Sequence, residues 1–129
     1  MVLTGAPLIA FAPSTDLARS RAFYEGVLGL RVVEDSSFAV AFDAHGTHVR
    51  ITAVEQRVAA PYTVLGWFVP DIADAIDALA ARGVAFNRYD GMDQDERGVW
   101  QSPSGARIAW FEDPDGNVLS LTQRGRERS

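Results

Sequence analysis

The inventory of side chains limits the acid–base, nucleophilic and metal chemistry that this sequence can perform. The 129 residues include two histidines and no cysteine, and all twelve basic residues are arginines. The lack of cysteine excludes thiolate nucleophiles, thiolate metal sites and disulfides. The lack of lysine excludes Schiff-base chemistry and a phosphate-binding P-loop. Any function must therefore come from histidine, carboxylate, hydroxyl, arginine and aromatic side chains.

The three tryptophans, Trp67, Trp100 and Trp110, all fall on predicted strands. Their ring faces could stack against a planar or cationic ligand, and packing in the core or in a dimer interface is the alternative. Arg50 carries a fork of donors that suits a carboxylate or phosphate, with a surface ion pair as its alternative. We take these four residues as candidate ligand contacts.

Four further places hold candidate polar groups. His48 lies on the same strand face as Arg50, because side chains two apart on a strand point the same way, and could be a polar contact, a plain surface residue or a metal ligand. Glu112 is the carboxylate near the sheet that could serve as a general base, and partial burial would raise its pKa. Ser120 is a lone hydroxyl in the apolar run VLSL. The acidic loop Asp93–Glu96 could capture a cationic ligand or be a solvated charge run.

These residues must be positioned by two similar halves of the chain. In the first half, Ser14, Thr15 and Asp16 can cap a helix that carries apolar residues at three- and four-residue spacing and ends at Gly29. The strands predicted around it are 8–12, 30–33, 38–42 and 49–51, with His45 in the turn 43–46 that joins the last two. The order is β-α-β-β-β.

The second half repeats this order, with one additional predicted strand. Asp71 caps a helix that Gly83 ends, and the predicted strands are 63–69, 84–86, 99–101, 108–111 and 118–121. Module 1 spans about 7–53, a linker 54–61, module 2 about 62–123, and a charged tail 124–129. We expect one α+β domain in which two βαβββ modules pair, within the chain or across a dimer, because neither module can bury its own sheet.

Composition narrows the function classes. Hydrophobic residues make up 47% of the chain and charged residues 22%, which is ordinary for a globular protein. No apolar run approaches the ~20 residues of a membrane span, and the start lacks a basic leader, so we expect a cytoplasmic protein without a membrane partner. A net charge of −5 with scattered arginines predicts no nucleic-acid partner.

Three segments, STDLARSRAFYEGVLGL (14–30), PDIADAIDALAARGV (70–84) and AWFEDPDGNVLSL (109–121), together resemble the vicinal oxygen chelate superfamily. This superfamily includes glyoxalase I, bleomycin resistance proteins and extradiol dioxygenases. The resemblance implies that each module curls its sheet into a half-barrel. It also implies a central cleft between the paired halves that holds the ligand and often a divalent metal.

In metal-dependent members of the family, side chains from the first and last strand of each module bind the ion. The corresponding positions here hold Ile9, Val64, Arg50 and Ser120. Two of these have no donor atom, arginine repels a cation, and serine is a feeble neutral donor. The resemblance thus predicts a protein with no metal ligands at these positions and no cofactor.

Three functional hypotheses follow. The first is a homodimer that binds a small organic molecule in its cleft without metal, as an antibiotic-sequestering protein of the resistance type does. The second is a metal-dependent lyase, isomerase or oxygenase of the glyoxalase or dioxygenase type that uses His48. The third is a metal-free isomerase or lyase with Glu112 as its base.

Overall fold

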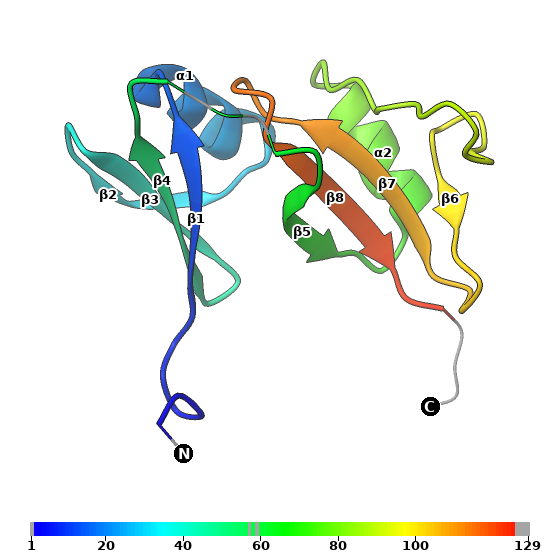
Figure 1. Cartoon of the computed structure of the whole chain (residues 1–129), viewed down its shortest axis with the longest axis horizontal. Coiled ribbons are helices and arrows are strands. Elements are labelled where there is room, and N and C mark those ends of the chain that lie inside the picture. The colour runs from blue at the N-terminus through cyan, green and yellow to red at the C-terminus, as the bar shows by residue number, and fades with distance from the viewer. Residues whose placement is uncertain (1, 57, 59, 126–129) are drawn as a thin grey trace. The chain divides into compact units, whose positions relative to one another are not determined.

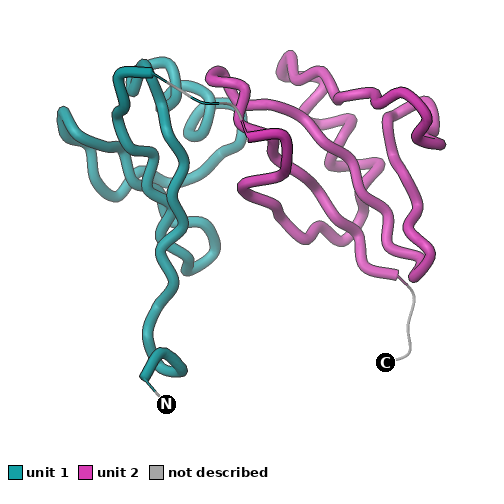
Figure 2. The backbone as a smooth tube through the Cα atoms, in the orientation of Figure 1, with its two compact units in different colours: residues 1–59 teal, residues 60–129 magenta. Residues whose placement is uncertain are grey.

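A computed structural model describes residues 2–56, 58 and 60–125 of the chain. The chain divides into two compact units, Met1–Ala59 and Ala60–Ser129 (Figure 2). Residues 57 and 59 of the predicted linker and residues 126–129 of the predicted charged tail lie outside the described residues.

The first unit is a four-stranded mixed sheet with one helical segment. Its elements are β1 (Ile9–Ser14), α1 (Leu17–Arg21), a π-helix (Ala22–Val27), β2 (Arg31–Asp35), β3 (Ala39–Ala44) and β4 (Thr47–Ala53). The strand order is β1-β4-β3-β2. β1 is parallel to β4, whereas the β2–β3 and β3–β4 pairs are antiparallel (Figure 1).

The helix of the first unit begins where the sequence predicts, but changes its winding midway. Asp16 caps it by accepting a hydrogen bond from the Arg19 backbone N–H at 3.1 Å. After Arg21 the winding widens into the π-helix, which ends with the Leu28 N–H bonded to the Phe23 carbonyl at 3.0 Å. The fully buried ring of Tyr24 lies 5.6 Å from that of Phe42. This aromatic contact fixes the helix on one face of the sheet.

The second unit repeats the connectivity of the first. Its elements are β5 (Thr63–Phe68), α2 (Ile72–Ala80), β6 (Trp100–Gln101), β7 (Arg107–Glu112) and β8 (Val118–Gln123). The strand order β5-β8-β7-β6 again places the first strand parallel to the last (Figure 1). Asp71 caps α2, and the Gln123 side chain at the end of β8 accepts a second hydrogen bond from the Ile72 backbone N–H at 2.9 Å.

One predicted strand of the second unit is wrong. Residues 84–86 form a single bridge, between Phe86 and Phe111, and no strand. The Asn87 N–H still bonds the Trp110 carbonyl at 2.7 Å, but the chain then leaves β7 because β6 pairs with the other end of that strand. The predicted strand 99–101 is shortened to the two residues of β6 for the same reason: β6 pairs only with Arg107 and Ile108.

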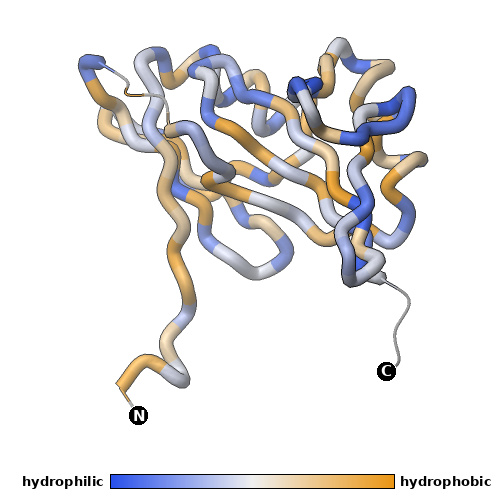
Figure 3. The backbone as a smooth tube through the Cα atoms, turned by 45° about the vertical axis from the view of Figure 1, so that its right-hand side comes forward, coloured by the Kyte–Doolittle hydropathy of each residue, from blue (hydrophilic) through white to orange (hydrophobic). Residues whose placement is uncertain are grey.

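The core of each unit lies between its helix and its sheet. Apolar residues concentrate within the strands, and hydrophilic ones gather in several connecting loops (Figure 3). The fully buried residues of the sheets include Phe42, Ile51, Phe111 and Leu119. The predicted α+β class with two βαβββ modules is confirmed by two mixed four-stranded sheets, each with its helical segment. Within the described ranges, no helix has the length and apolar character that crossing a membrane requires.

Candidate functional site

The most distinctive chemistry lies on one face of the sheet in the second unit. Its other face carries the buried residues Ala109, Phe111, Leu119 and Leu121, and α2 contacts β7 and β8. Register places Ser120 between Gly66 of β5 and Trp110 of β7, with all three side-chain positions on one face. Trp100 shares that face because it pairs with Ile108, two residues before Trp110. We call this the Trp110 face, defined by Gly66, Trp100, Trp110, Glu112 and Ser120.

Aromatic rings cluster on the Trp110 face. The ring centroids of Trp100 and Trp110 are 6.3 Å apart at 37°. Tyr89, from the loop after α2, meets Trp110 edge to face at 5.7 Å and 81°. Both tryptophans are half-buried, and Tyr89 is exposed. The cluster thus has the offset and edge-to-face geometry that aromatic groups prefer, and it retains accessible ring surface.

Trp67 does not join this cluster. It pairs with Leu121, which in turn pairs with Ala109, so its side chain lies on the buried face of the sheet. Of the three tryptophans that the sequence proposes as ligand contacts, the structure thus brings two together and places the third on the opposite side.

Glu112 lies at the end of the Trp110 face and is exposed. The Asn87 side-chain amide donates to the Tyr89 hydroxyl at 3.0 Å and lies 3.4 Å from the Glu112 carboxylate. Asn87 therefore links the carboxylate to the aromatic cluster. The role of Glu112 as a general base stays a prediction.

In the first unit, Arg50 and His48 share a sheet face with Ile9 and Phe11. The Arg50 guanidinium donates to the Glu34 carboxylate at 3.0 Å, which forms an ion pair. His48 lies in register between Ile9 and Asp43. Arg50 thus already has a carboxylate partner, which agrees with the alternative prediction of a surface ion pair.

The residues at the four family positions do not fit a divalent metal ion. Ile9 and Val64 offer no donor atom, the Arg50 charge would repel the ion, and Ser120 offers one neutral hydroxyl. Across residues 2–56, 58 and 60–125, no group of three or more histidine, aspartate or glutamate side chains could hold a metal.

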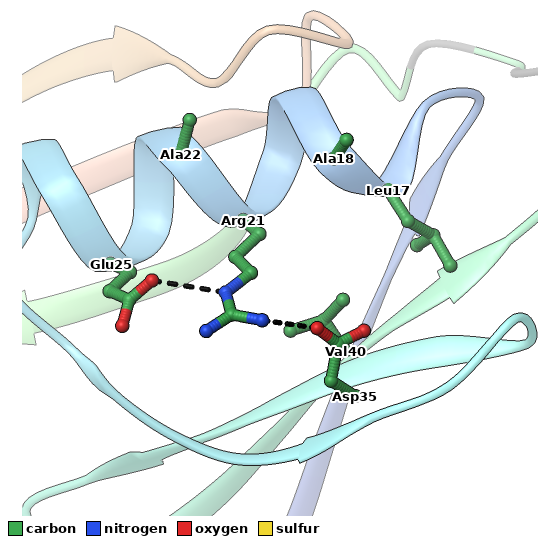
Figure 4. Close-up of a pocket in the computed structure, with 7 residues that line it drawn as sticks. All are labelled: Leu17, Ala18, Arg21, Ala22, Glu25, Asp35 and Val40. Atoms are coloured by element: carbon green, nitrogen blue, oxygen red, sulfur yellow. Dashed lines mark hydrogen bonds and ion pairs between the residues drawn. The ribbon is translucent and has the colours of Figure 1, made fainter.

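A cavity of about 460 Å³ lies on the helix side of the first unit (Figure 4). Arg21 crosses it, donating to Glu25 at 3.0 Å and pairing with Asp35 of β2. The hydrogen bond and charge of Glu25, then the bond to Asp35, raise the pKa of Arg21. Leu17, Ala18, Ala22 and Val40 complete the lining. Because both carboxylates face this one guanidinium, the charged groups of the cavity satisfy one another.

The acidic loop forms part of a smaller cavity, of about 240 Å³, in the second unit. Asp93, Asp95, Trp100 and Arg107 are among its lining residues. The Asp95 carboxylate accepts the backbone N–H groups of Arg97 and Val99, both at 2.9 Å, and lies 3.7 Å from Arg107. Asp95 therefore shapes the loop, which leaves Asp93 as the carboxylate of this cavity that could meet a cation.

Sequence reasoning missed three residues of the site: Gly66, Asn87 and Tyr89. A glycine inside a strand often marks close approach of another group, so Gly66 carried a usable signal. Asn87 and Tyr89 lie in an irregular loop, where no periodicity indicates which way a side chain points.

Comparison with known proteins agrees with this fold. The family model described as Glyoxalase/Bleomycin resistance protein/Dioxygenase superfamily matches residues 9–121. A structure described as a member of that superfamily from Sphaerobacter thermophilus shares 25% identity, with a TM-score of 0.74, and the match covers 95% of this chain and 99% of that one.

Two further solved structures are similar at lower identity, and they bear on the fold alone. A glyoxalase/bleomycin resistance protein/dioxygenase from Alicyclobacillus acidocaldarius has a TM-score of 0.72 at 17% identity, covering 93% of this chain and 92% of that one. A lactoylglutathione lyase from Agrobacterium tumefaciens has a TM-score of 0.66 at 17% identity, covering 92% and 93%. A search of curated proteins gives no significant match.

Proposed function

The chain belongs to the glyoxalase/bleomycin resistance protein/dioxygenase superfamily, and on that premise we propose that it binds a small planar organic molecule on the Trp110 face without a metal ion. The observation that carries the proposal is the cluster of Trp100, Trp110 and Tyr89, which keeps accessible ring surface on one sheet face.

Stacking supplies the affinity in this proposal. An aromatic pair contributes about 0.5–1.5 kcal/mol beyond the area that it buries. Small-molecule sites are typically apolar surfaces with a few placed polar groups, and the Trp110 face has that composition. A positively charged substituent would gain further from the ring faces and from Asp93 in the neighbouring cavity. We therefore favour planar ligands, neutral or cationic.

Sequestration is the form of activity that we propose, as in the resistance-type hypothesis from the sequence. The residues at the family's metal positions lack a chelating set. The carboxylate on the Trp110 face, Glu112, is exposed and has the Asn87 amide as its neighbour. A tightly held ligand that leaves unchanged fits this chemistry.

The test is a binding titration with two matched variants. Quinoline, phenazine and acridine compounds are titrated into the protein while tryptophan fluorescence and the melting temperature are followed. We expect Trp110→Leu to weaken binding roughly three- to tenfold, because one stacking partner is lost. Trp67→Leu removes a tryptophan from the other face of the same sheet, so it should leave the affinity unchanged.

Two results would contradict the proposal. One is a flat fluorescence response with no thermal shift across all three compound classes. The other is an equal loss of affinity in both variants. Melting curves of the ligand-free variants show whether each one still unfolds cooperatively, so that a folding defect is not read as lost binding.

A further inference from the structure

Ser120 carries a buried hydroxyl that has no hydrogen-bond partner among the residues that the structure describes. The residue is 8% exposed, and no hydrogen bond of its hydroxyl is found within residues 2–56, 58 and 60–125. No fully buried side-chain nitrogen or oxygen in that part of the chain lacks a partner. It follows that the Ser120 Oγ, although deep in the sheet, keeps a point of access from outside. A polar group in such a place costs stability unless something bonds to it.

The space around this hydroxyl depends on Gly66. A Cβ built on Gly66 would lie 2.6 Å from the Ser120 Oγ, closer than such atoms approach one another. The serine hydroxyl therefore occupies the volume that any side chain at position 66 would need. The Ser120 hydroxyl keeps this position because residue 66 is a glycine, and a side chain there would push the hydroxyl aside.

The equivalent row of the first unit is built differently. There, Phe11 and Ala41 flank Arg50 in register, as Gly66 and Trp110 flank Ser120. Arg50 has its charge paired with Glu34, whereas Ser120 has a bare backbone on one side and an aromatic ring on the other. A small, neutral, unpartnered hydroxyl beside a stacking surface is thus particular to the second unit.

We propose that the Ser120 hydroxyl hydrogen-bonds a neutral polar substituent on the edge of the planar ligand, which stacks on Trp110. The inference rests on the proposed function and adds the ligand class: an aromatic compound with a hydroxyl, carbonyl or amide group. A serine hydroxyl can both donate and accept, so it serves each of these groups. Its low exposure means that little water competes for the bond.

The experiment compares two probes of similar shape, 2-naphthol and 2-methylnaphthalene. Binding to the intact chain is followed through the tryptophan indole N–H signals in proton–nitrogen correlation spectra. The quantity measured is the ratio of the two dissociation constants in wild type, divided by the same ratio in Ser120→Ala. Taking the ratio of ratios cancels the difference in hydrophobicity between the probes.

We expect this ratio of ratios to favour 2-naphthol in wild type by roughly fivefold, the size of one neutral hydrogen bond. Gly66→Ala should reduce the preference as well, because the new methyl group displaces the hydroxyl. Thr122→Val is the matched control, since it removes a hydroxyl from the same face of β8 and should keep the preference.

Three other results are possible, and each would contradict a specific part of the proposal. Binding of both probes with a ratio of ratios near one overturns the role of Ser120 and leaves the stacking proposal standing. Loss of the preference in Thr122→Val with its retention in Ser120→Ala overturns the assignment of the hydroxyl. Absence of any signal shift in wild type with either probe overturns the proposed function and this inference together.

Discussion

At the scale of single residues, Asp113 explains the DPDGN stretch that joins β7 to β8. Its carboxylate accepts the backbone N–H groups of Asp115 and Asn117, both at 2.9 Å, and the Asn117 side-chain amide at 2.8 Å. Asp113, Asp115 and Asn117 are all buried. One side chain thus satisfies three buried donors, as aspartate does in tight turns.

Asp113→Ala should lower the free energy of unfolding by about 2–4 kcal/mol. The reason is that several buried donors lose their acceptor, and each unsatisfied group costs about 1–3 kcal/mol. Asp113→Asn keeps one acceptor oxygen and should fall between the variant and wild type. Urea denaturation at pH 7 measures all three proteins.

The control is Asp90→Ala, because Asp90 is an exposed loop residue and its loss should change stability by less than about 0.5 kcal/mol. Equal effects of the two alanine variants would show that the hydrogen bonds of Asp113 contribute nothing of their own.

The sequence alone predicts only part of the candidate site. The sequence identifies Ser120, Trp100 and Trp110, but not the face on which each lies. A register shift between Thr63 and Leu65 in β5 inserts an extra residue. Such a bulge reverses the alternation of faces along the strand. Gly66, and not Leu65, therefore pairs with Ser120, and no count along the sequence reveals this.

At the scale of elements, α2 is tied to the loop that precedes β6. The Arg97 guanidinium donates to both carboxylate oxygens of Asp77, at 2.9 and 3.0 Å. This bidentate hydrogen bonding, followed by the charge of Arg97, lowers the pKa of Asp77, and the same contact raises the pKa of Arg97. The pair joins the middle of the helix to a segment twenty residues further along.

This ion pair predicts a specific dependence of stability on pH. A carboxyl whose pKa is lowered by folding stabilises the native state above its ordinary pKa of about 3.9, and that contribution is lost as the pH falls through the lowered value. Asp77→Asn should therefore lower the melting temperature by a constant amount from pH 5 to 7. Below about pH 3.9 the difference from wild type should shrink.

The effect should be no more than a few degrees, because the pair is exposed to solvent and salt. Asp90→Asn, which replaces the carboxylate of an exposed loop residue, serves as the control. A melting-temperature difference between wild type and Asp77→Asn that stays constant down to pH 2.5 would argue against a role of the carboxylate charge.

Most elements were predictable, and the exceptions have tertiary causes. Capping aspartates, terminal glycines and apolar periodicity located both helices and each of the eight strands that the described residues form, together with a ninth strand, 84–86, that does not form. The π-helix was not predictable, because the apolar residues of this segment have the three- and four-residue spacing of an ordinary helix. The failed strand 84–86 is locally β-like, but only Phe86 finds a partner, on β7.

At the scale of the whole molecule, one connectivity is used twice with different side chains. Each unit places its first strand parallel to its last, with two further antiparallel strands in the same order. At equivalent positions of their last strands, the first unit has Arg50, which forms an ion pair with Glu34, and the second unit has Ser120 with its hydroxyl. The repeat conserves the frame while the chemistry of the two sheet faces diverges.

This divergence predicts how the intact protein responds to divalent ions. A ligand that binds only the native state stabilises it, by about 2.7 kcal/mol at a concentration of 100 times its dissociation constant. For a domain of this size, that amounts to a rise in melting temperature of more than about 5 °C. Arginine and serine at the family positions offer no chelating set, so nickel, zinc, manganese and ferrous ions should each leave the melting temperature within about 1 °C. His48→Ala is the control variant, because it separates adventitious binding by this histidine from a metal site built by other residues. A rise of several degrees that a chelator reverses and that persists in His48→Ala would show that other residues hold a metal. The second hypothesis from the sequence, a metal-dependent enzyme of the glyoxalase or dioxygenase type, would then be the better one.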